Sequence, residues 1–269
     1  MSASAPTDIA QAVGDVALWY HTIELPDGSA TPGWFDLRPI VGRMPFPDVR
    51  GMRCLDVGTY DGFLAFELER RGAREVVATD VSDHGDWDWP ARMRERGPAA
   101  LAQIAGGKGR GFEVARELLG SSVRKVELSA YDLSPELVGT FDVVVCGSLL
   151  LHLREPVRAL EAIRSVCAGS FLSAEHVELG LSLRHPRTPV SRLNAEAELC
   201  QWWLPNVAAH RQMLVTAGFR VQRATRPYAI PFGAAHPPVA PRLLRRVAAG
   251  GQGVPHAAAL ARPDLADPG

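Results

Sequence analysis

Hydrophobic and polar residues come in alternating blocks along the middle of the chain, and these blocks predict alternating strands and helices. Short apolar runs typical of buried strands lie at 53–57, 75–79, 123–128, 141–146, 171–175 and 219–225. Between them, apolar residues recur at helical spacing, as in the helix that Gly72 ends and the helix that Glu155 and Pro156 open. This order predicts a doubly wound, parallel α/β sheet of the Rossmann-like type, with helices on both faces.

The ends of the chain and two internal stretches lack this regular pattern. Residues 8–19 have the apolar spacing of a short helix, and 20–51 are rich in Pro, Gly and aromatic residues, as in many active-site lids. We therefore expect an N-terminal helix and lid at 1–51 and a main domain at 52–236. Within that domain, 82–111 and 178–205 are expected to be irregular insertions, and 237–269 a partly disordered tail rich in Pro, Ala and Arg.

Composition narrows the class of protein. The 269 residues are 46% hydrophobic and carry a net charge of −1, with two lysines against 27 arginines. A nucleic-acid-binding protein normally has a basic face, so this balance argues against such a partner. The sequence has no apolar stretch of membrane-spanning length, no cationic leader and no paired cysteine motif. We expect a cytoplasmic protein with no membrane partner, whose oligomeric state the sequence leaves open.

The strongest local signal is the stretch CLDVGTYDG, which follows the first predicted strand. Gly58 and Gly62 allow a tight turn and close approach of a ligand to the backbone. Asp80 ends the next predicted strand, 18 residues past Gly62, where a carboxylate can accept hydrogen bonds from a ribose. An ordinary strand–helix turn with a buried acid is the alternative interpretation.

The details of this turn favour one kind of nucleoside. A dinucleotide site needs a glycine where this chain has Tyr60, because a pyrophosphate must touch bare backbone there. Asp56 and Asp61 add negative charge at the same place. A cationic nucleoside without phosphate, such as S-adenosylmethionine (SAM), fits better. After the third predicted strand, Asp132 and the Leu133 N–H could bind an adenine, although this sequence is also typical of a helix start.

The successive motifs DVGTYDG, TDVS, YDLSP and FDVVVCGSLLLHLREPVRAL resemble those of class I SAM-dependent methyltransferases over residues 50–225. This resemblance implies a seven-stranded sheet whose last strand is antiparallel, with SAM as methyl donor and S-adenosylhomocysteine (SAH) as product. Tyr60 departs from the family, which usually has glycine there. The cofactor contacts implied are Asp56, Gly58, Tyr60, Gly62, Asp80, Val81, Asp132, Leu133 and Ser148.

Segments outside the core are similar to one branch of this family, the enzymes that transfer carboxymethyl groups to the wobble uridine of tRNA. They are residues 20–25, 31–33 and 202–206. Such enzymes need cations for RNA and for a carboxylated SAM, and this chain has few lysines. We therefore expect methylation of a small, aromatic or electron-rich metabolite, with a role in secondary metabolism. A tRNA-modifying enzyme and a non-catalytic nucleoside-binding protein are the alternatives.

Methyl transfer needs a general base only when the acceptor must lose a proton. Candidates on the lid and after the fourth strand are Tyr20, His21, Glu24 and His152. Candidate contacts with the substrate are Trp34, Glu175, His176, Trp202 and Trp203. Each has a structural alternative: the lid residues could fix the lid to the body, His152 could pack on the cofactor, and the tryptophans could join segments.

Two other patterns carry no chemistry in our interpretation. Residues 106–111 (GGKGRG) resemble a phosphate-binding loop, but they follow no strand and have Gly109 where Ser or Thr is required. We expect a flexible linker there. Residues 83–86 (DHGD) offer a single imidazole in a loop, so a solvated turn is expected and no metal site is predicted.

Overall fold

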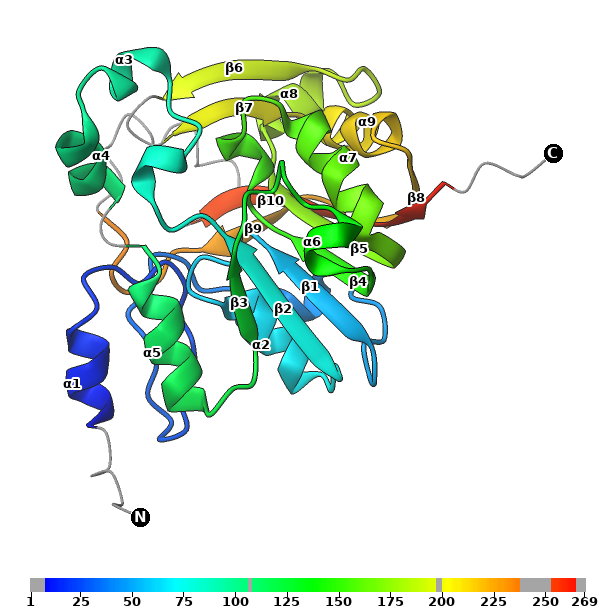
Figure 1. Cartoon of the computed structure of the whole chain (residues 1–269). Helices are drawn as coiled ribbons and strands as arrows, with labels where there is room; N and C mark the ends of the chain where they lie inside the picture. Colours follow the sequence, from blue (N-terminus) through cyan, green and yellow to red (C-terminus); the bar gives the residue numbers. More distant parts are fainter. Residues whose placement is uncertain (1–7, 106–107, 197–199, 238–252, 265–269) are drawn as a thin grey trace.

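The structure is a computed structural model, and it describes residues 8–105, 108–196, 200–237 and 253–264. A twisted central sheet runs through the molecule, with helices on both faces (Figure 1). Among the described ranges, no helix is long and apolar enough to cross a membrane.

The sheet has the predicted doubly wound form. Its strands follow the order β3-β2-β1-β4-β5-β10-β8. In addition, β9 pairs with the first four residues of β10, Gly253 to His256. The first five are parallel, while β10 is antiparallel to both of its neighbours, β5 and β8. The strands are β1 Arg53–Val57, β2 Glu75–Asp80, β3 Arg124–Glu127, β4 Phe141–Cys146, β5 Cys167–His176, β8 Phe219–Ala224, β9 Tyr228–Pro231 and β10 Gly253–Pro263. The expected parallel sheet with an antiparallel last strand is confirmed.

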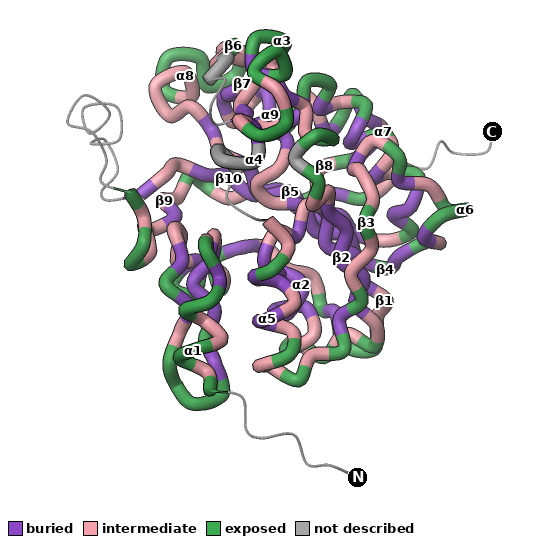
Figure 2. The backbone as a smooth tube through the Cα atoms, turned by 60° about the vertical axis from the view of Figure 1, so that its left-hand side comes forward, coloured by how far each residue is buried: buried purple, intermediate pink, exposed green. Residues whose placement is uncertain are grey.

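Helices cover the two faces of the sheet and create two hydrophobic clusters. One cluster joins the sheet to α2, α5 and the N-terminal segment, and the other joins it to α6, α7 and α9. Buried residues are concentrated in the central strands between these layers of helices (Figure 2). The helices are α1 Ile9–Gly14, α2 Phe63–Arg70, α3 Ala91–Arg94, α4 Pro98–Ala105, α5 Arg110–Leu119, α6 Pro135–Val138, α7 Pro156–Val166, α8 Leu179–Arg184 and α9 Val207–Thr216, with short 3-10 turns η1 Val41–Arg43, η2 His84–Asp86 and η3 Leu150–His152.

Local sequence explains several of the boundaries. Pro156 is the first residue of α7, where a missing backbone N–H costs no hydrogen bond. Asn206 caps α9 by accepting a hydrogen bond from the Ala209 N–H at 2.7 Å. Gly218 follows this helix with φ +85°, a conformation that glycine adopts without strain.

The two internal insertions are more regular than the sequence predicted. Residues 82–111 contain η2, α3, α4 and the start of α5, and the stretch 178–205 contains α8 and a hairpin of β6 Ser191–Glu196 with β7 Gln201–Pro205. Trp89 is fully buried in a small cluster with Met93, Leu101 and Cys200. This cluster joins the two insertions. It was not predicted from the sequence, because Cys200 is far from the other three residues in the chain.

The expectation of a tail after residue 236 is wrong for residues 253–264. Gly253–Pro263 form β10, which pairs with β5 along one side and with β8 and β9 along the other. The rest of the predicted tail, 238–252 and 265–269, lies outside the described residues. The run Ala257–Ala259 is buried on both faces of the sheet, so it shows neither alternation nor the branched side chains that usually mark a strand.

The N-terminal segment packs into the body of the protein. Helix α1 is shorter than predicted, and the chain after it forms isolated β-bridges, including His21–Phe35 and Phe35–Phe232. Trp19 and Ile23 are buried in the same cluster as α2 and α5. The segment therefore covers one face of the sheet next to the ends of the strands.

We predict that the fold depends on β10. A chain that ends at residue 252 leaves the backbone of β5 and β8 unpaired, so it is expected to show no cooperative thermal transition by circular dichroism. A chain that ends at residue 264 keeps β10 and is expected to melt within a few degrees of the full chain. A cooperative transition in the shorter chain would contradict this role of β10.

Candidate functional site

The turn between β1 and α2 has the conformation that its glycines suggest. Gly58 and Gly62 have φ values of +75° and +97°. Tyr60 lies between them with φ +52°, and its N–H donates to a carboxylate oxygen of Asp80 at 2.7 Å. A non-glycine residue in this conformation is uncommon, and the bond to Asp80 stabilises it. Tyr60 thus joins the ends of β1 and β2.

Asp80 is a buried acid with several partners at this edge of the sheet. It is only 6% exposed, and its carboxylate accepts hydrogen bonds from the N–H groups of Tyr60 and Val81, both at 2.7 Å. The Lys108 ammonium forms an ion pair with it at 2.5 Å and lies over the rings of Tyr60 and Trp87, at 5.2 and 4.9 Å from their centroids. The charge of Asp80 is therefore paired inside the protein.

Lys108 is a residue that the sequence analysis missed. It belongs to the glycine-rich stretch expected to be a linker, of which residues 106–107 lie outside the described ranges. Gly109 approaches Ser82, and Arg110 begins α5. Since a lysine 28 positions from Asp80 gives no local signal, only the fold could reveal this pair.

Asp56, within β1, is a buried acid, and only one of its carboxylate oxygens has a hydrogen-bond partner among the described residues. One carboxylate oxygen accepts a hydrogen bond from Thr59 Oγ at 2.7 Å, and the other has no partner among the described residues. Burial raises the pKa of Asp56 to about 7, against the lowering effects of the Thr59 hydrogen bond and of His21. A buried polar atom without a partner costs free energy unless a ligand or water meets it.

Asp61 holds the N-terminal segment against this turn. Its carboxylate accepts hydrogen bonds from the backbone N–H groups of Tyr20 and His21, at 2.8 and 2.7 Å, and contacts His21 Nδ1. The Tyr20 ring lies 4.7 Å from that of Tyr60. Burial, followed by the nearby charges of Asp61 and Glu175, raises the pKa of Tyr20, so its hydroxyl is neutral. These contacts favour the structural interpretation of His21.

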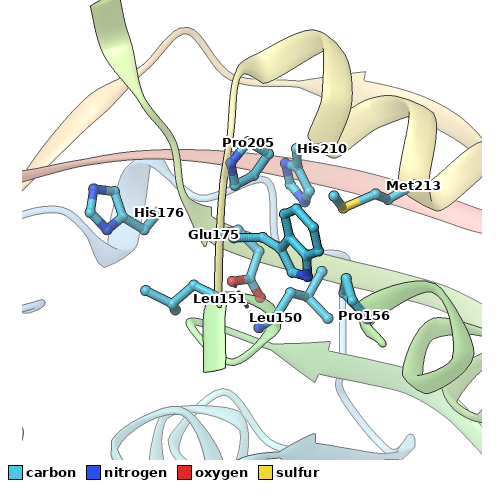
Figure 3. Close-up of a pocket in the computed structure, with 9 residues that line it drawn as sticks. Leu150, Leu151, Pro156, Glu175, His176, Pro205, His210 and Met213 are labelled. Atoms are coloured by element: carbon cyan, nitrogen blue, oxygen red, sulfur yellow. Dashed lines mark hydrogen bonds between the residues drawn. The ribbon is translucent and has the colours of Figure 1, made fainter. Parts of the chain in front are cut away.

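Glu175 fixes the backbone that follows β4. One carboxylate oxygen accepts a hydrogen bond from the Leu149 N–H at 3.2 Å. The other accepts one from the Leu150 N–H at 3.1 Å (Figure 3). Burial raises the pKa of Glu175 to about 8, although these hydrogen bonds lower it. His176, the next residue of β5, lines the same pocket from a different side than Glu175 (Figure 3).

The structure brings some predicted residues to this edge and places others elsewhere. Asp132 and the buried Leu133 follow β3, while Ser148 and half-buried His176 follow or end β4 and β5. Glu24 is exposed, so it does not join the group.

Aromatic and imidazole groups of the insertions are engaged in structural contacts. His152 Nδ1 lies 3.0 Å from the Cys200 carbonyl oxygen. The Trp202 indole donates to the Asp88 carbonyl at 2.6 Å, and the Trp203 indole donates to the Arg154 carbonyl at 3.0 Å. Both indoles tie the β6–β7 hairpin to neighbouring loops. Trp34 remains half-buried near Tyr20, with their ring centroids 6.4 Å apart.

The edge is suited to hold a cationic nucleoside. Asp56 and Asp80 lie in β1 and β2, and Asp132 follows the adjacent parallel strand β3. Asp80 ends its strand at the carboxyl edge, whereas Asp56 is only 1% exposed inside β1. The contacts with SAM that the resemblance implies remain predictions, and Lys108 is an additional neighbour of Asp80.

We predict that Glu175→Gln changes how stability depends on pH. Folded Glu175 keeps its proton up to about pH 8, whereas the unfolded chain releases it near 4.5, so the folded state binds more protons between these values. The free energy of unfolding of the wild type should therefore fall with rising pH across this window, relative to the variant, by a few kcal/mol at about 1.4 kcal/mol per pKa unit.

Urea unfolding at a series of pH values measures this difference. Glu161→Gln, an exposed position on α7, is the matched control and should give a curve parallel to the wild type. Parallel curves for the wild type and Glu175→Gln would show that Glu175 is ionised throughout.

Comparison with known proteins identifies the family. A family model described as a methyltransferase domain matches residues 36–223. The tRNA U34 carboxymethyltransferase of Campylobacter hominis is 26% identical over 121 residues, which are 45% of this chain and 34% of that protein. The match thus spans about a third of the length of that relative.

The chain was also compared with solved structures, and one of them supports the fold. The N-terminal domain of EvdMO1, solved with SAH bound, has a TM-score of 0.57 at 15% identity and covers 97% of this chain and 98% of that chain. The 1,6-didemethyltoxoflavin-N1-methyltransferase of Burkholderia thailandensis has a TM-score of 0.46 at 18% identity, covering 80% and 72%. Because the family match spans more than half of the sequence, this chain belongs to the methyltransferase-domain family of class I SAM-dependent methyltransferases.

Proposed function

We propose that this methyltransferase acts on a small, uncharged, aromatic or electron-rich metabolite, by O-, N- or C-methylation. The observation that supports this proposal is the N-terminal segment bound to Asp61. It puts Tyr20 and Trp34 close to the turn after β1, next to the ends of the strands. A site covered in this way suits a ligand that fits beneath the segment better than a folded RNA.

When bound, SAM supplies a methyl carbon that its sulfonium activates toward a nucleophile. The contribution of this chain is then to align the acceptor and exclude water. Neutral Tyr20 and Tyr60, whose rings are in contact near the strand ends, can do both. His21 is engaged with Asp61, so we assign it to positioning of the segment rather than to proton transfer.

A tRNA-modifying function is the second candidate, because the Campylobacter relative bears that name. The ion pairs that the two lysines form argue against a tRNA-modifying function. Lys108 is paired with Asp80, and Lys125 is paired with Glu127 at 2.8 Å. An RNA surface needs cations that face outward, so neither lysine is available without breaking an internal ion pair. A secondary-metabolite substrate and a cytoplasmic location remain predictions from the sequence.

Transfer of radioactive methyl groups tests the substrate class. The full chain is incubated with methyl-labelled SAM and either a small-metabolite extract or purified tRNA, and the label is followed by chromatography. We expect label in a small-molecule fraction and none in tRNA above a heat-inactivated control. Labelled tRNA, together with tight binding that weakens steeply with salt, would instead support the second candidate.

We predict opposite effects of Asp80 and Lys108 on cofactor binding. Asp80→Asn removes charged acceptors for the ribose, so SAH should bind about tenfold to a hundredfold more weakly by calorimetry, given roughly 1.5–3 kcal/mol for such bonds. Lys108→Met frees the carboxylate oxygen that the ammonium occupies, so SAH should bind several-fold more tightly. Asp83→Asn, an exposed neighbour, is the control. Unchanged affinity in Asp80→Asn would contradict the assignment of Asp80.

A further inference from the structure

A row of three aromatic side chains crosses three adjacent strands at the carboxyl edge of the sheet. His256 of β10 is paired in register with His176 of β5 on one side and with Tyr228 of β9 on the other. The His256 ring is stacked against both neighbours, with centroids 5.6 Å from His176 and 6.3 Å from Tyr228. Paired residues of adjacent strands point to the same face, so the row forms one continuous surface.

Ser148 contacts the middle of this row, with its Oγ 2.8 Å from His256 Nε2. The other ring nitrogen, Nδ1, lies 2.9 Å from the Val254 carbonyl oxygen, which can only accept, so Nδ1 carries the hydrogen. A neutral imidazole then has an acceptor at Nε2, and burial keeps it neutral by lowering the pKa of His256 to about 3. The single hydrogen of Ser148 is therefore donated to His256 or to the Ala174 carbonyl oxygen, which lies 3.3 Å from Oγ.

This arrangement makes the Ser148 oxygen an acceptor only. Its remaining lone pairs can take a hydrogen bond but cannot give one. Ser148, His176 and Tyr228 are each half-buried, whereas His256 between them is only 5% exposed, so a ligand would reach the row at Ser148 and at the two outer rings. The hydroxyl of Tyr228 is buried and has no hydrogen-bond partner among the described residues, which a bound ligand would explain.

The charges around the row cancel or are absent. Burial lowers the pKa of His176 to about 4, against the raising effect of Glu178, so this ring is neutral as well. Glu178 is itself paired with Arg192 at 3.1 Å. Glu175 lies on the opposite face of β5 and keeps its proton at pH 7. A ligand on this surface meets rings and hydroxyls rather than formal charge.

The row lies away from the acids that the resemblance assigns to the cofactor, and Ser148, which the resemblance also assigns to the cofactor, contacts the row instead. Asp80 ends β2, and β10 is four strands away in the sheet order, about 19 Å at 4.8 Å per strand. We propose that Ser148, oriented by His256, accepts a hydrogen bond from a neutral ring bearing a hydroxyl or N–H, which rests on the His176–His256–Tyr228 row as the methyl acceptor. This proposal rests on the proposed function and names the contacts of its substrate.

Phenol and anisole are matched probes of this site, because they share a ring and differ in the O–H donor. Their binding to the SAH-saturated full chain is measured by NMR titration. We expect the wild type to bind phenol about threefold to tenfold more tightly than anisole, as one hydrogen bond predicts. In Ser148→Ala the two affinities should become equal.

His256→Phe separates orientation of Ser148 from simple packing. The ring remains, but the Ser148 hydrogen loses its acceptor at 2.8 Å and keeps only the Ala174 carbonyl oxygen at 3.3 Å. The anisole oxygen can then compete for this hydrogen, so anisole should gain relative to phenol. Ser173→Ala is the matched control, since it removes a similar Ser–His contact, 2.9 Å to His210 Nε2, on the other face of β5. The Ser173→Ala variant should keep the wild-type ratio of phenol affinity to anisole affinity.

The outcomes distinguish this inference from the proposed function. If the wild type binds SAH but binds phenol and anisole equally, or binds neither probe, the role of Ser148 is overturned. The methyltransferase assignment then still stands. Labelled tRNA in the transfer experiment would instead overturn the small-molecule substrate. A ratio that changes equally in Ser148→Ala and Ser173→Ala would show that both serines act only through stability.

Discussion

The antiparallel insertion of β10 between β5 and β8 is the constraint on which the rest of the structure depends. Without it, the two neighbours would face each other across an unpaired gap. Its alternate residues complete both hydrophobic clusters, with Ala258 in one and Ala259 in the other. Small side chains suit this place, because helices and the N-terminal segment press on both faces of the sheet. The same strand brings His256 to the carboxyl edge.

Electrostatics divides that edge into two halves. Around β1 and β2, Asp80 accepts hydrogen bonds from backbone N–H groups and pairs with Lys108, and other acids lie nearby. Around β5 and β10, burial removes charge instead, leaving neutral imidazoles and a protonated Glu175. One edge of one sheet thus offers a polar cofactor half and a neutral half. This contrast is the physical basis for expecting an uncharged acceptor.

Comparison of prediction and structure shows where local signals are sufficient. The parallel strands, the glycine turn at Gly58 and Gly62, and Asp80 at the end of β2 follow from hydrophobic runs and short motifs. The insertions were expected to be irregular, yet they form helices and a hairpin, because Trp89 and Cys200 pack together only in the fold. Glu24 was predicted to be a catalytic residue, but its side chain is exposed and none of the site contacts described above involves it.

The sequence by itself determined the family, the parallel core and the acids that face the cofactor, since each depends on residues close together in the chain. Only the tertiary structure decided the partners of these groups. Lys108 reaches Asp80 across 28 positions, and His256 reaches Ser148 across 108. The alanine-rich strand that carries His256 lacks periodicity because it is buried on both faces. Long-range pairing of this kind leaves no local pattern, so the row of His176, His256 and Tyr228 became visible only once the strands were in register.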